Sequence, residues 1–369
     1  MRKFVSRYIP TTAALLCAGV AIAQDGDELV LEEVIVTAQQ RVESLQDVPV
    51  SVNAVAGEKI SEAGIEKIED IALYVPNLSM SETGIGTNLY LRGIGSGINN
   101  GFEQSVGMYV DGIYYGRPQL TRVPFLDLER VEVLRGPQMI LFGKNSIAGA
   151  ISMITAKPTD EFEASVSGLY EVNFNEREIT AIVSGPLVEG LRGRVAIQKR
   201  DIDGYIDNIT LGRDEPQRDE LFVRGTLAWD VTPDLDVSLK IEYGEFDVTG
   251  RQVEITADQP ILPIADYFVP PTLAAIFPGQ SYAQVLNSLG ADASVLNTTQ
   301  DFDRSASGPE FSNNVIKNVT LTGNWALGEH TLTSITGYLN YEFVEECDCD
   351  FTGANIFTVP AQENFEQFS

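Results

Sequence analysis

Strict alternation of apolar and polar residues dominates the second half of the chain. From Phe162 onward, apolar side chains occupy every second position in runs of about ten residues, the pattern of strands with one apolar and one polar face. We expect about eight such strands, the last two less regular than the others. The runs cover residues 162–174, 179–185, 191–198, 221–229, 235–243, 319–327, 330–341 and 363–369.

The connections between these runs alternate in length. The short ones lie near 186–190, 231–234 and 328–329, and the long ones span 202–218, 247–316 and 342–362. Only the first connection, near Phe174, breaks this rule. A soluble antiparallel sheet also fits the alternation, but it gives no reason for tight turns at one end and long loops at the other. Outer-membrane barrels have this asymmetry, and we therefore expect transmembrane β-strands.

The residues between Val48 and Pro158 combine strand-like and helix-like patterns of apolar residues. Alternation predicts strands near 49–55, 89–93 and 106–115, and the Asp111-Gly112 pair favours a hairpin turn within the last of these. Isoleucines at helical spacing predict a helix over 61–74, with Ser61 as its N-cap. Together these elements indicate a compact α+β domain of about 110 residues, a usual domain size.

The end of this domain, residues 127–158, reads as one folded unit. A strand over 131–134 is stopped by Arg135-Gly136-Pro137, a helical turn covers 138–142, and a second strand covers 150–155. A charged Arg135 between buried strands needs partners, and Glu129 and Glu132 are the carboxylates nearest in sequence.

The N-terminus has the features of a secretory signal peptide. Arg2, Lys3 and Arg7 precede an apolar run too short to span a membrane, and Ala21-Ile22-Ala23 is a cleavage site. Cys17 does not indicate a lipoprotein, because Leu16 before it is too large. Removal of three basic residues takes the net charge from −28 to about −31, which excludes nucleic acid and anionic surfaces as natural partners.

Candidates for enzymatic or metal chemistry are few. His330 is the single histidine, lies in a predicted turn, and supports no catalytic triad. Gly143-Lys144-Asn145-Ser146 lacks the preceding glycine of a phosphate loop, because Gln138 stands there. Cys347 and Cys349, with the neighbouring carboxylates, leave two readings open: a soft-metal site or a local disulfide in an exported loop, of which we favour the disulfide. We expect no enzyme activity and no cofactor.

A short apolar segment, Glu33–Ala38, lies between an acidic start and a polar run. It fits an ordinary first strand, but its place before any folded unit favours a free segment that adds to the edge of a partner's sheet.

At this point the chain resembles the TonB-dependent outer-membrane receptors. Glu33, Val34, Ile35, Val36, Thr37 and Ala38 look like the TonB box of that family. Five segments resemble motifs of its plug domain: 46–52, 75–78, 91–93, 109–112 and 127–157, the last with Leu134–Gln138 at its centre. Two departures, Met139-Ile140 and Ala148-Gly149, stand where glycine or small residues are usual.

The resemblance implies a division of the chain into four parts. These are a signal peptide (1–23), a flexible N-terminus with the TonB box (24–44), a plug domain (45–158) and the first part of a β-barrel (159–369). The family's barrel has 22 strands around its plug, so eight strands suggest the N-terminal part of a longer receptor. A signalling receptor would carry an extra domain before the TonB box, and a passive barrel or adhesin would lack both plug and box.

The resemblance also implies a mechanism and partners. An extracellular ligand binds, the box is offered to the periplasm, and TonB with its inner-membrane energising complex pulls the plug to open a path. The expected location is the Gram-negative outer membrane, among its lipids, with a periplasmic N-terminus and insertion by the barrel assembly machinery. A ferric siderophore is the family's commonest cargo, while an oligosaccharide, cobalamin, haem or a nickel complex stays open.

Two sets of candidate residues complete the predictions. Plug loops suggest ligand contacts at Asn99, Asn100, Arg117 and Gln119. A gating or structural role in the plug is expected for Arg92, Asp111, Glu132, Arg135 and Asn145.

Overall fold

The structure is a computed structural model that describes residues 35–37, 43–44, 46, 48–83, 86–97, 103–260 and 279–369. The predicted signal peptide, Glu33, Val34 and Ala38 of the predicted TonB box, and the candidate contacts Asn99 and Asn100 lie outside these residues. In the described part of the chain, no helix is both long and apolar enough to cross a membrane.

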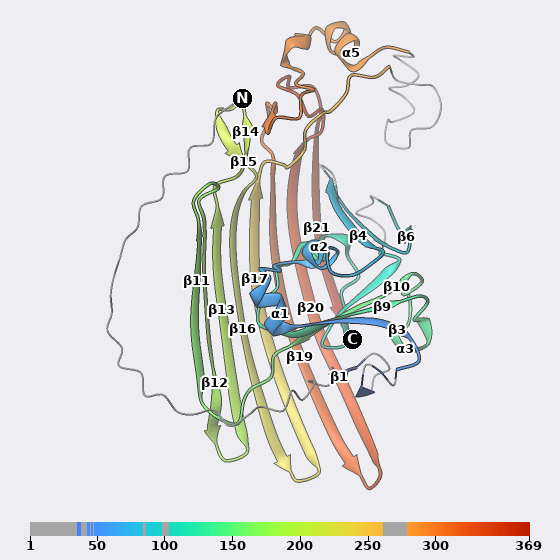
Figure 1. Ribbon diagram of the computed structural model, residues 1–369, viewed down its shortest axis with the longest axis vertical. Coiled ribbons are helices and arrows are strands. Elements are labelled where there is room, and N and C mark those ends of the chain that lie inside the picture. Colours follow the sequence, from blue (N-terminus) through green and yellow to red (C-terminus); the bar gives the residue numbers. More distant parts are fainter. Residues whose placement is uncertain are drawn as a thin grey trace, which may run out of the picture. The chain divides into compact units, whose positions relative to one another are not determined.

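The largest element is an eight-stranded antiparallel sheet, called the wall below (Figure 1). Each strand pairs with the next along the chain, and the first and last strands form its two edges. The strands are β11 (Glu163–Glu171), β12 (Glu176–Val188), β13 (Leu191–Ile202), β16 (Gln217–Thr232), β17 (Leu235–Thr249), β19 (Phe311–Leu327), β20 (His330–Asp348) and β21 (Thr358–Phe368).

The strands are longer than predicted. β19 and β20 have 17 and 19 residues rather than about ten, because antiparallel pairing continues past the apolar band into polar sequence. The predicted last long connection, 342–362, is therefore wrong: β20 continues to Asp348, and only residues 349–357 link it to β21. Tight turns gather at one end of the wall and long excursions at the other, as predicted (Figure 1).

The two faces of the wall differ in polarity. On one face, side chains such as Val195, Trp229 and Ile241 are about half exposed. On the other face, Arg224, Lys240 and Glu242 are buried against the mixed domain. Alternate residues of a strand point to opposite faces, so the outer face is apolar, and the face toward the domain carries charged and polar side chains together with apolar ones such as Phe222.

The mixed domain is built on a five-stranded sheet in the order β3-β9-β10-β7-β8. Only the β10–β7 pair is parallel. Its strands are β3 (Ser51–Ala56), β9 (Leu128–Arg135), β10 (Gly149–Thr155), β7 (Val106–Val110) and β8 (Ile113–Tyr114). The helical turn α3 (Met139–Phe142) joins β9 to β10, as predicted. A second sheet contains β4 (Leu78–Thr83), β5 (Gly86–Leu91) and β6 (Ile94–Gly95), and a 3₁₀ helix, η1, covers Pro118–Arg122.

The single helix predicted over 61–74 is wrong. Two short helices, α1 (Gly57–Glu62) and α2 (Ile68–Ile71), replace it, and Ser61 lies inside α1 rather than at an N-cap. Gly64 has a φ of 61° and breaks the helix, and the Asp70 carboxylate accepts hydrogen bonds from the backbone N–H groups of Glu66 and Lys67. The isoleucines are buried as expected, but from two short helices rather than from one long face.

Two apolar clusters occupy opposite faces of β9. The larger contains Val131 and Val133, together with helix residues and wall residues such as Phe222. The smaller contains Leu134 and also Val36 from the N-terminal segment. That segment is therefore packed against the domain.

The excursions at the far end of the wall carry their own secondary structure. β14 (Ile206–Asn208) pairs with β15 (Arg213–Glu215) and, in parallel, with β18 (Asp303–Arg304). Helices α5 (Tyr282–Ser288) and η2 (Ala293–Val295) lie in the longest excursion. Two excursions far apart in sequence thus share one small sheet.

Candidate functional site

The described part of the predicted TonB box is docked on the mixed domain. Strand β1 (Ile35–Val36) pairs with β2 (Glu43–Ser44), and the Val36 side chain is fully buried. The backbone N–H of Thr37 donates to Glu132 Oε1 at 2.8 Å, and its hydroxyl donates to the same oxygen at 3.1 Å. One buried carboxylate therefore anchors the end of the segment.

Glu132 is held in turn by Arg130. The Arg130 Nε donates to Glu132 Oε1 at 2.7 Å, and the same guanidinium pairs with Glu129. The expected pairing of Arg135 with these carboxylates is wrong, because Arg130 pairs with both of them. Arg135 is an odd number of residues from Glu132 and faces the other side of β9. In the described part of the chain, the buried Nε of Arg135 has no hydrogen-bond partner.

Arg92 and Asn145 occupy turns. Both residues have positive φ angles, 53° and 63°, which residues other than glycine seldom adopt. The Arg92 Nη2 lies 3.4 Å from Ser51 Oγ, and the Asn145 Nδ2 donates to the Tyr114 hydroxyl at 3.0 Å and to Glu103. These contacts stay within the domain.

Asp111 joins the domain to the wall. It follows β7, accepts hydrogen bonds from the N–H and hydroxyl of Thr155 at 2.9 and 2.8 Å, and forms an ion pair with Lys240 of β17. Burial acts to raise the pKa of Asp111, but the Lys240 ammonium together with the hydrogen bonds from Lys240 and Thr155 holds the pKa below its usual value. The Asp111 carboxylate is therefore charged and paired with the wall.

A second set of contacts lies beside it. Asp127 receives two hydrogen bonds from Arg194 of β13, at 2.7 and 2.6 Å. Arg224 of β16 donates to the carbonyl oxygens of Leu126 and Asp127 and to the Glu242 carboxylate, the last at 2.6 Å. Sequence reasoning missed these wall residues, although charged side chains at the inward positions of alternating strands are a usable signal.

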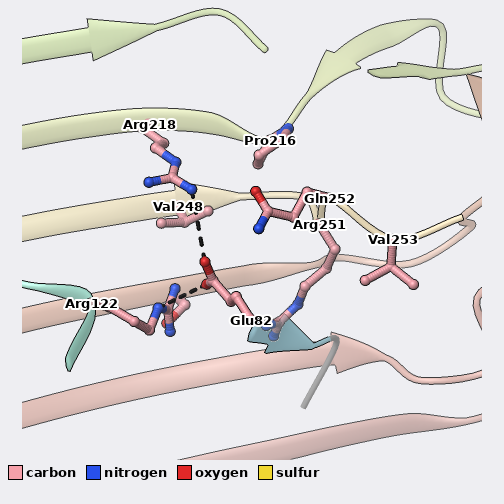
Figure 2. A pocket seen from close by; sticks show the side chains of 10 residues that line it. Glu82, Arg122, Pro216, Arg218, Val248, Arg251, Gln252 and Val253 are labelled. Atoms are coloured by element: carbon pink, nitrogen blue, oxygen red, sulfur yellow. Dashed lines mark hydrogen bonds and ion pairs between the residues drawn. The ribbon is translucent and has the colours of Figure 1, made fainter. Parts of the chain in front are cut away.

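A third contact lies nearer the excursions (Figure 2). The Glu82 carboxylate of β4 lies 2.9 Å from the Nε of Arg122 and 3.9 Å from Arg218 of the wall. Burial alone would raise the pKa of Glu82, but the two guanidinium groups hold it at about 2. Arg251 lines the same small pocket.

Arg200 of β13 forms a fourth contact and is shared by several carboxylates. It pairs with Glu66 of the domain, with Glu176 of β12 at 2.7 Å, and with Glu220 of β16 at 3.6 Å. Burial, together with the nearby carboxylates of Glu176 and Glu178, raises the pKa of Glu66 to about 7 even though Arg200 opposes the shift. A single guanidinium group cannot neutralise the charges of all three carboxylates.

Of the predicted ligand contacts, only Arg117 and Gln119 lie in the described residues. The Arg117 Nε lies 2.8 Å from Glu363 of β21, and its guanidinium lies 4.7 Å above the Phe365 ring. Gln119 is 2% exposed, within η1. Both side chains therefore lie at the contact with the wall or inside the domain, and their role in ligand binding stays a prediction.

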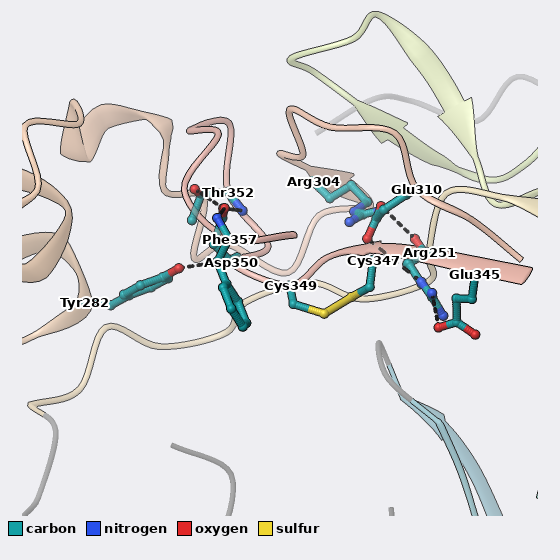
Figure 3. The surroundings of a disulfide bond; sticks show 10 residues. All are labelled: Arg251, Tyr282, Arg304, Glu310, Glu345, Cys347, Cys349, Asp350, Thr352 and Phe357. Carbon is teal, nitrogen blue, oxygen red and sulfur yellow. Dashed lines mark hydrogen bonds and ion pairs between the residues drawn. A yellow bond between two sulfur atoms is a disulfide. The ribbon is translucent and has the colours of Figure 1, made fainter. Parts of the chain in front are cut away.

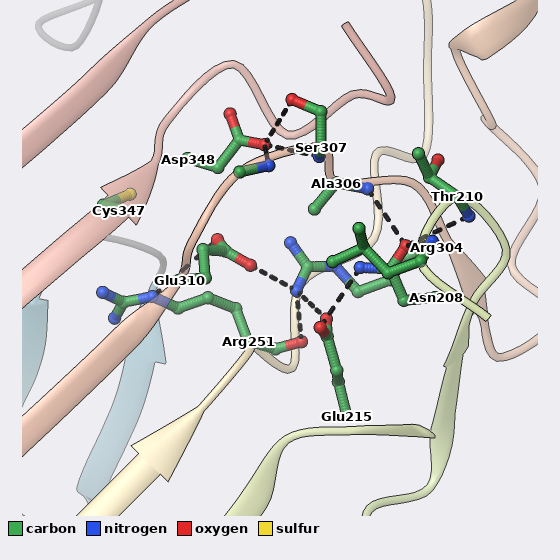
Figure 4. Close-up of polar contacts among 12 residues, drawn as sticks. Asn208, Thr210, Glu215, Arg251, Arg304, Ala306, Ser307, Glu310, Cys347 and Asp348 are labelled. Atoms are coloured by element: carbon green, nitrogen blue, oxygen red, sulfur yellow. Dashed lines mark hydrogen bonds and ion pairs between the residues drawn. The ribbon is translucent and has the colours of Figure 1, made fainter. Parts of the chain in front are cut away.

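The excursions are joined by buried charges (Figure 4). The Arg304 Nη1 donates to Glu215 Oε2 and Glu310 Oε2, both at 2.7 Å, and to the Arg251 carbonyl oxygen at 3.1 Å. Arg304 is 2% exposed. It ties β18 to β15 and to the start of β19.

Cys347 and Cys349 form a disulfide next to this network, in agreement with the reading we favoured (Figure 3). Asp348 accepts from the N–H groups of Ser307 and Gly308 at 2.7 and 3.0 Å. The Tyr282 hydroxyl donates to the Asp350 carbonyl oxygen at 2.6 Å. No group of three or more potential metal ligands occurs among the described residues.

Comparisons with known proteins agree with this arrangement. Residues 44–150 match the family model described as TonB-dependent Receptor Plug Domain. The pesticin receptor of Yersinia pestis is 28% identical over 225 residues, which are 58% of this chain and 32% of that protein. The ferripyoverdine receptor of Pseudomonas aeruginosa is 27% identical over 219 residues, 58% of this chain and 26% of that protein.

Solved structures share the fold. The ferric yersiniabactin uptake receptor FyuA of Yersinia pestis superposes with a TM-score of 0.63 at 18% identity, over 81% of this chain and 42% of that one. The Pseudomonas aeruginosa receptor bound to ferripyoverdine gives a TM-score of 0.61, also at 18% identity, over 85% of this chain and 37% of that one.

The mixed domain is a plug, and the wall is part of an outer-membrane β-barrel. Residues 44–150 carry the TonB-dependent receptor plug domain, and the chain is similar to TonB-dependent outer-membrane receptors of Gram-negative bacteria. It spans about a third of the length of the curated relatives that it matches first.

Proposed function

We propose that this chain is part of a TonB-dependent receptor that imports a scarce extracellular ligand, a ferric siderophore. The proposal includes the four-part division of the chain, with the plug at 45–158 and the TonB box at Glu33–Ala38. TonB and its inner-membrane complex act on the box from the periplasm.

One observation carries the proposal. The described residues of the box segment, 35–37, contact the plug through the buried Val36 side chain and the hydrogen bonds of Thr37 to the Glu132 carboxylate, and their two-residue strand pairs with Glu43–Ser44. Such a small contact is released at modest cost, whereas the plug core behind it is extensively buried. A segment that can leave without unfolding the plug is what a pulling partner requires.

The plug–wall contacts support the same reading. The plug meets the wall through ion pairs and hydrogen bonds at Asp111, Asp127, Glu66 and Glu82, and through an apolar cluster that includes Phe222 of the wall. The charged pairs can exchange partners for water when the plug shifts, whereas separation at the apolar cluster exposes buried side chains to water.

The coupling step is tested by deleting residues 34–38 in the receptor produced in its native outer membrane. We expect uptake of radiolabelled cargo to be abolished, with receptor abundance unchanged. The matched control deletes residues 24–28, which precede the segment. Uptake that survives the deletion of 34–38 would refute the TonB-box assignment.

The cargo class is tested by abundance of the receptor during iron starvation and during growth on oligosaccharides. Relatives named as ferripyoverdine and ferric yersiniabactin receptors favour iron chelates. Induction by iron starvation alone supports the siderophore reading, and induction by oligosaccharides alone would overturn it in favour of glycan import.

A further inference from the structure

The outer face of the wall, which points away from the plug, contains a groove of about 470 Å³. The groove crosses β12, β13, β16 and β17 on the side of their tight turns. Its walls are apolar side chains of the outer face, namely Phe162, Leu187, Val195, Leu227, Leu239 and Ile241. It is therefore a hollow in a surface that is otherwise covered by half-exposed apolar side chains.

Glycines form the floor of the groove. Gly185 lies opposite Gly193 in the β12–β13 ladder, and Gly225 lies opposite Val195 in the β13–β16 ladder. A Cβ atom on Gly225 would meet no heavy atom within 4 Å, and its φ is not positive. Neither the backbone nor the packing of the wall thus requires glycine at this position, and its missing side chain leaves the groove open.

The groove faces the leaflet of the outer membrane that is nearest the periplasm, because tight turns lie on the periplasmic side of such barrels. That leaflet supplies phospholipid acyl chains at this depth. Acyl chains are as apolar as the groove, so hydrophobicity alone does not hold one there. Shape does, because the walls of an unfilled groove lack partner atoms that an extended chain would provide.

The turn end of the groove carries excess negative charge. Glu161 lies beside the glycine floor, Glu189 lies in the β12–β13 turn, and both are exposed. Within the described part of the chain, neither carboxylate forms an ion pair. The nearby Arg192 guanidinium is already paired with Asp160 at 2.9 Å and with Asp230 at 2.8 Å. This end therefore favours a cationic amine over an anionic headgroup.

We propose that the groove holds one acyl chain of a phospholipid whose headgroup carries an amine. The chain lies over Gly225 and Gly193, and the ammonium group lies near Glu161 and Glu189. This lipid stays bound, whereas lipids on the rest of the outer face exchange with the bilayer. The inference goes beyond ligand import and does not depend on the cargo, so its failure would leave the proposed function standing.

The first test counts the phospholipid that stays with the receptor after purification from its native outer membrane, by native mass spectrometry. Gly225→Leu fills the groove. Gly323→Leu is the matched control, because Gly323 lies on the outer face of β19, outside the groove, and its Cβ would meet only the Asp236 carbonyl oxygen at 4.0 Å. We expect retention to fall about tenfold in Gly225→Leu, through the loss of on the order of ten atom contacts, and to stay unchanged in Gly323→Leu.

Equal retention in these two variants would overturn the proposal. A purified receptor that is a dimer, and that becomes a monomer in Gly225→Leu, would also overturn it, because a second copy would then occupy the groove.

A second pair of variants covers the case in which Gly225→Leu does not reach the membrane. Leu227 lies opposite Gly193, so Leu227→Trp covers the groove from its wall. Leu321→Trp is the control, because Leu321 is similarly exposed on the outer face of β19, outside the groove. Retention should fall in Leu227→Trp alone, and an equal loss in both variants would mean that the lipid is not held by this groove.

The headgroup is tested in nanodiscs that contain equal amounts of phosphatidylethanolamine and phosphatidylglycerol. We expect the retained lipid to be phosphatidylethanolamine by about three- to fivefold, as exposed ion pairs allow. Glu161→Gln with Glu189→Gln should abolish this preference. Asp234→Asn with Glu329→Gln, at two other tight turns, should preserve it. A preference for phosphatidylglycerol, or a preference that survives loss of Glu161 and Glu189, would overturn the headgroup assignment.

Discussion

The plug is held differently by two sectors of the wall. Along β13, arginines hold carboxylates of the plug, with Arg194 and Asp127 joined by two hydrogen bonds. Along β17–β20, serine and threonine surround a cavity beside the Lys240 ion pair, and farther from the tight turns apolar side chains such as Phe246 and Leu339 pack into the plug core. The difference teaches that one plug is held by buried charges in one sector of the wall and mainly by apolar packing in another.

Loss of the Arg194 contact should produce the largest effect. Both side chains are largely buried, and removing one partner leaves the other charge unpaired at a cost of about 3–5 kcal/mol. Arg194→Ala should therefore make the plug sensitive to protease in outer-membrane fragments. Thr322→Ala, in the other sector, should leave protease sensitivity unchanged. Equal sensitivity of both variants would erase the distinction between the sectors.

Val36→Asp should have the next largest effect, confined to the box segment. Val36 is fully buried among Leu134, Ala150 and Tyr109, and a carboxylate there lacks a partner. We expect the local opening of the segment to become easier by about 1–3 kcal/mol. Hydrogen exchange at residues 35–37 measures this directly, and exchange in β9 should stay slow. Loss of protection throughout β9 would contradict a separately releasable segment.

Ionisation of Glu66 should lower the stability of the folded protein as pH rises. The pKa of Glu66 in the folded protein is about 7, above its ordinary value of 4.5, so burial favours the protonated form. The stability from this group is complete below pH 4.5 and is lost as pH rises through 7. Thermal unfolding of Glu66→Gln should match the parent at pH 4.5 and exceed it by about 1 kcal/mol at pH 8, after allowance for partial solvent exposure. A parent protein that is more stable than Glu66→Gln at pH 8 would contradict a raised pKa of Glu66.

Reduction of the Cys347–Cys349 disulfide should have the smallest effect. It closes a very short loop, and Asp348 and Asp350 continue to hold the same backbone through their own hydrogen bonds. Cys347→Ser with Cys349→Ser should change the unfolding temperature by only about 1–2 °C, and a chelator should change nothing. A large loss on chelation would revive the metal reading of these thiols.

Much of the fold was predictable because single physical rules decide it. Alternation places Val195, Ile241 and Trp229 on one face, and that face is exposed in the structure. The two strands within residues 127–158 were predictable because Gly136-Pro137 ends the first run of β-branched residues before the second run begins. Pairing beyond the apolar band could not be predicted, because polar residues such as Asn314 pair in a ladder as readily as apolar ones do.

Less of the candidate site was predictable. The partners of Asp111 and Asp127 come from strands more than 60 residues away, and no local pattern names them. The two-residue period of a strand excludes Glu132 as a partner of Arg135, and Glu129 pairs with its immediate neighbour Arg130 instead. The same period, applied consistently, assigns Glu132 to Arg130.

The shared sheet of the excursions has a consequence for chimeric receptors. Arg304 in one excursion relies on Glu215 in another, and Asp207 in β14 donates its N–H to the Phe302 carbonyl oxygen beside β18. Grafting either loop alone from a relative would leave a buried charge without its partner and a β-strand without its neighbour. The two excursions are therefore one exchangeable module, to be transplanted together when ligand preference is engineered.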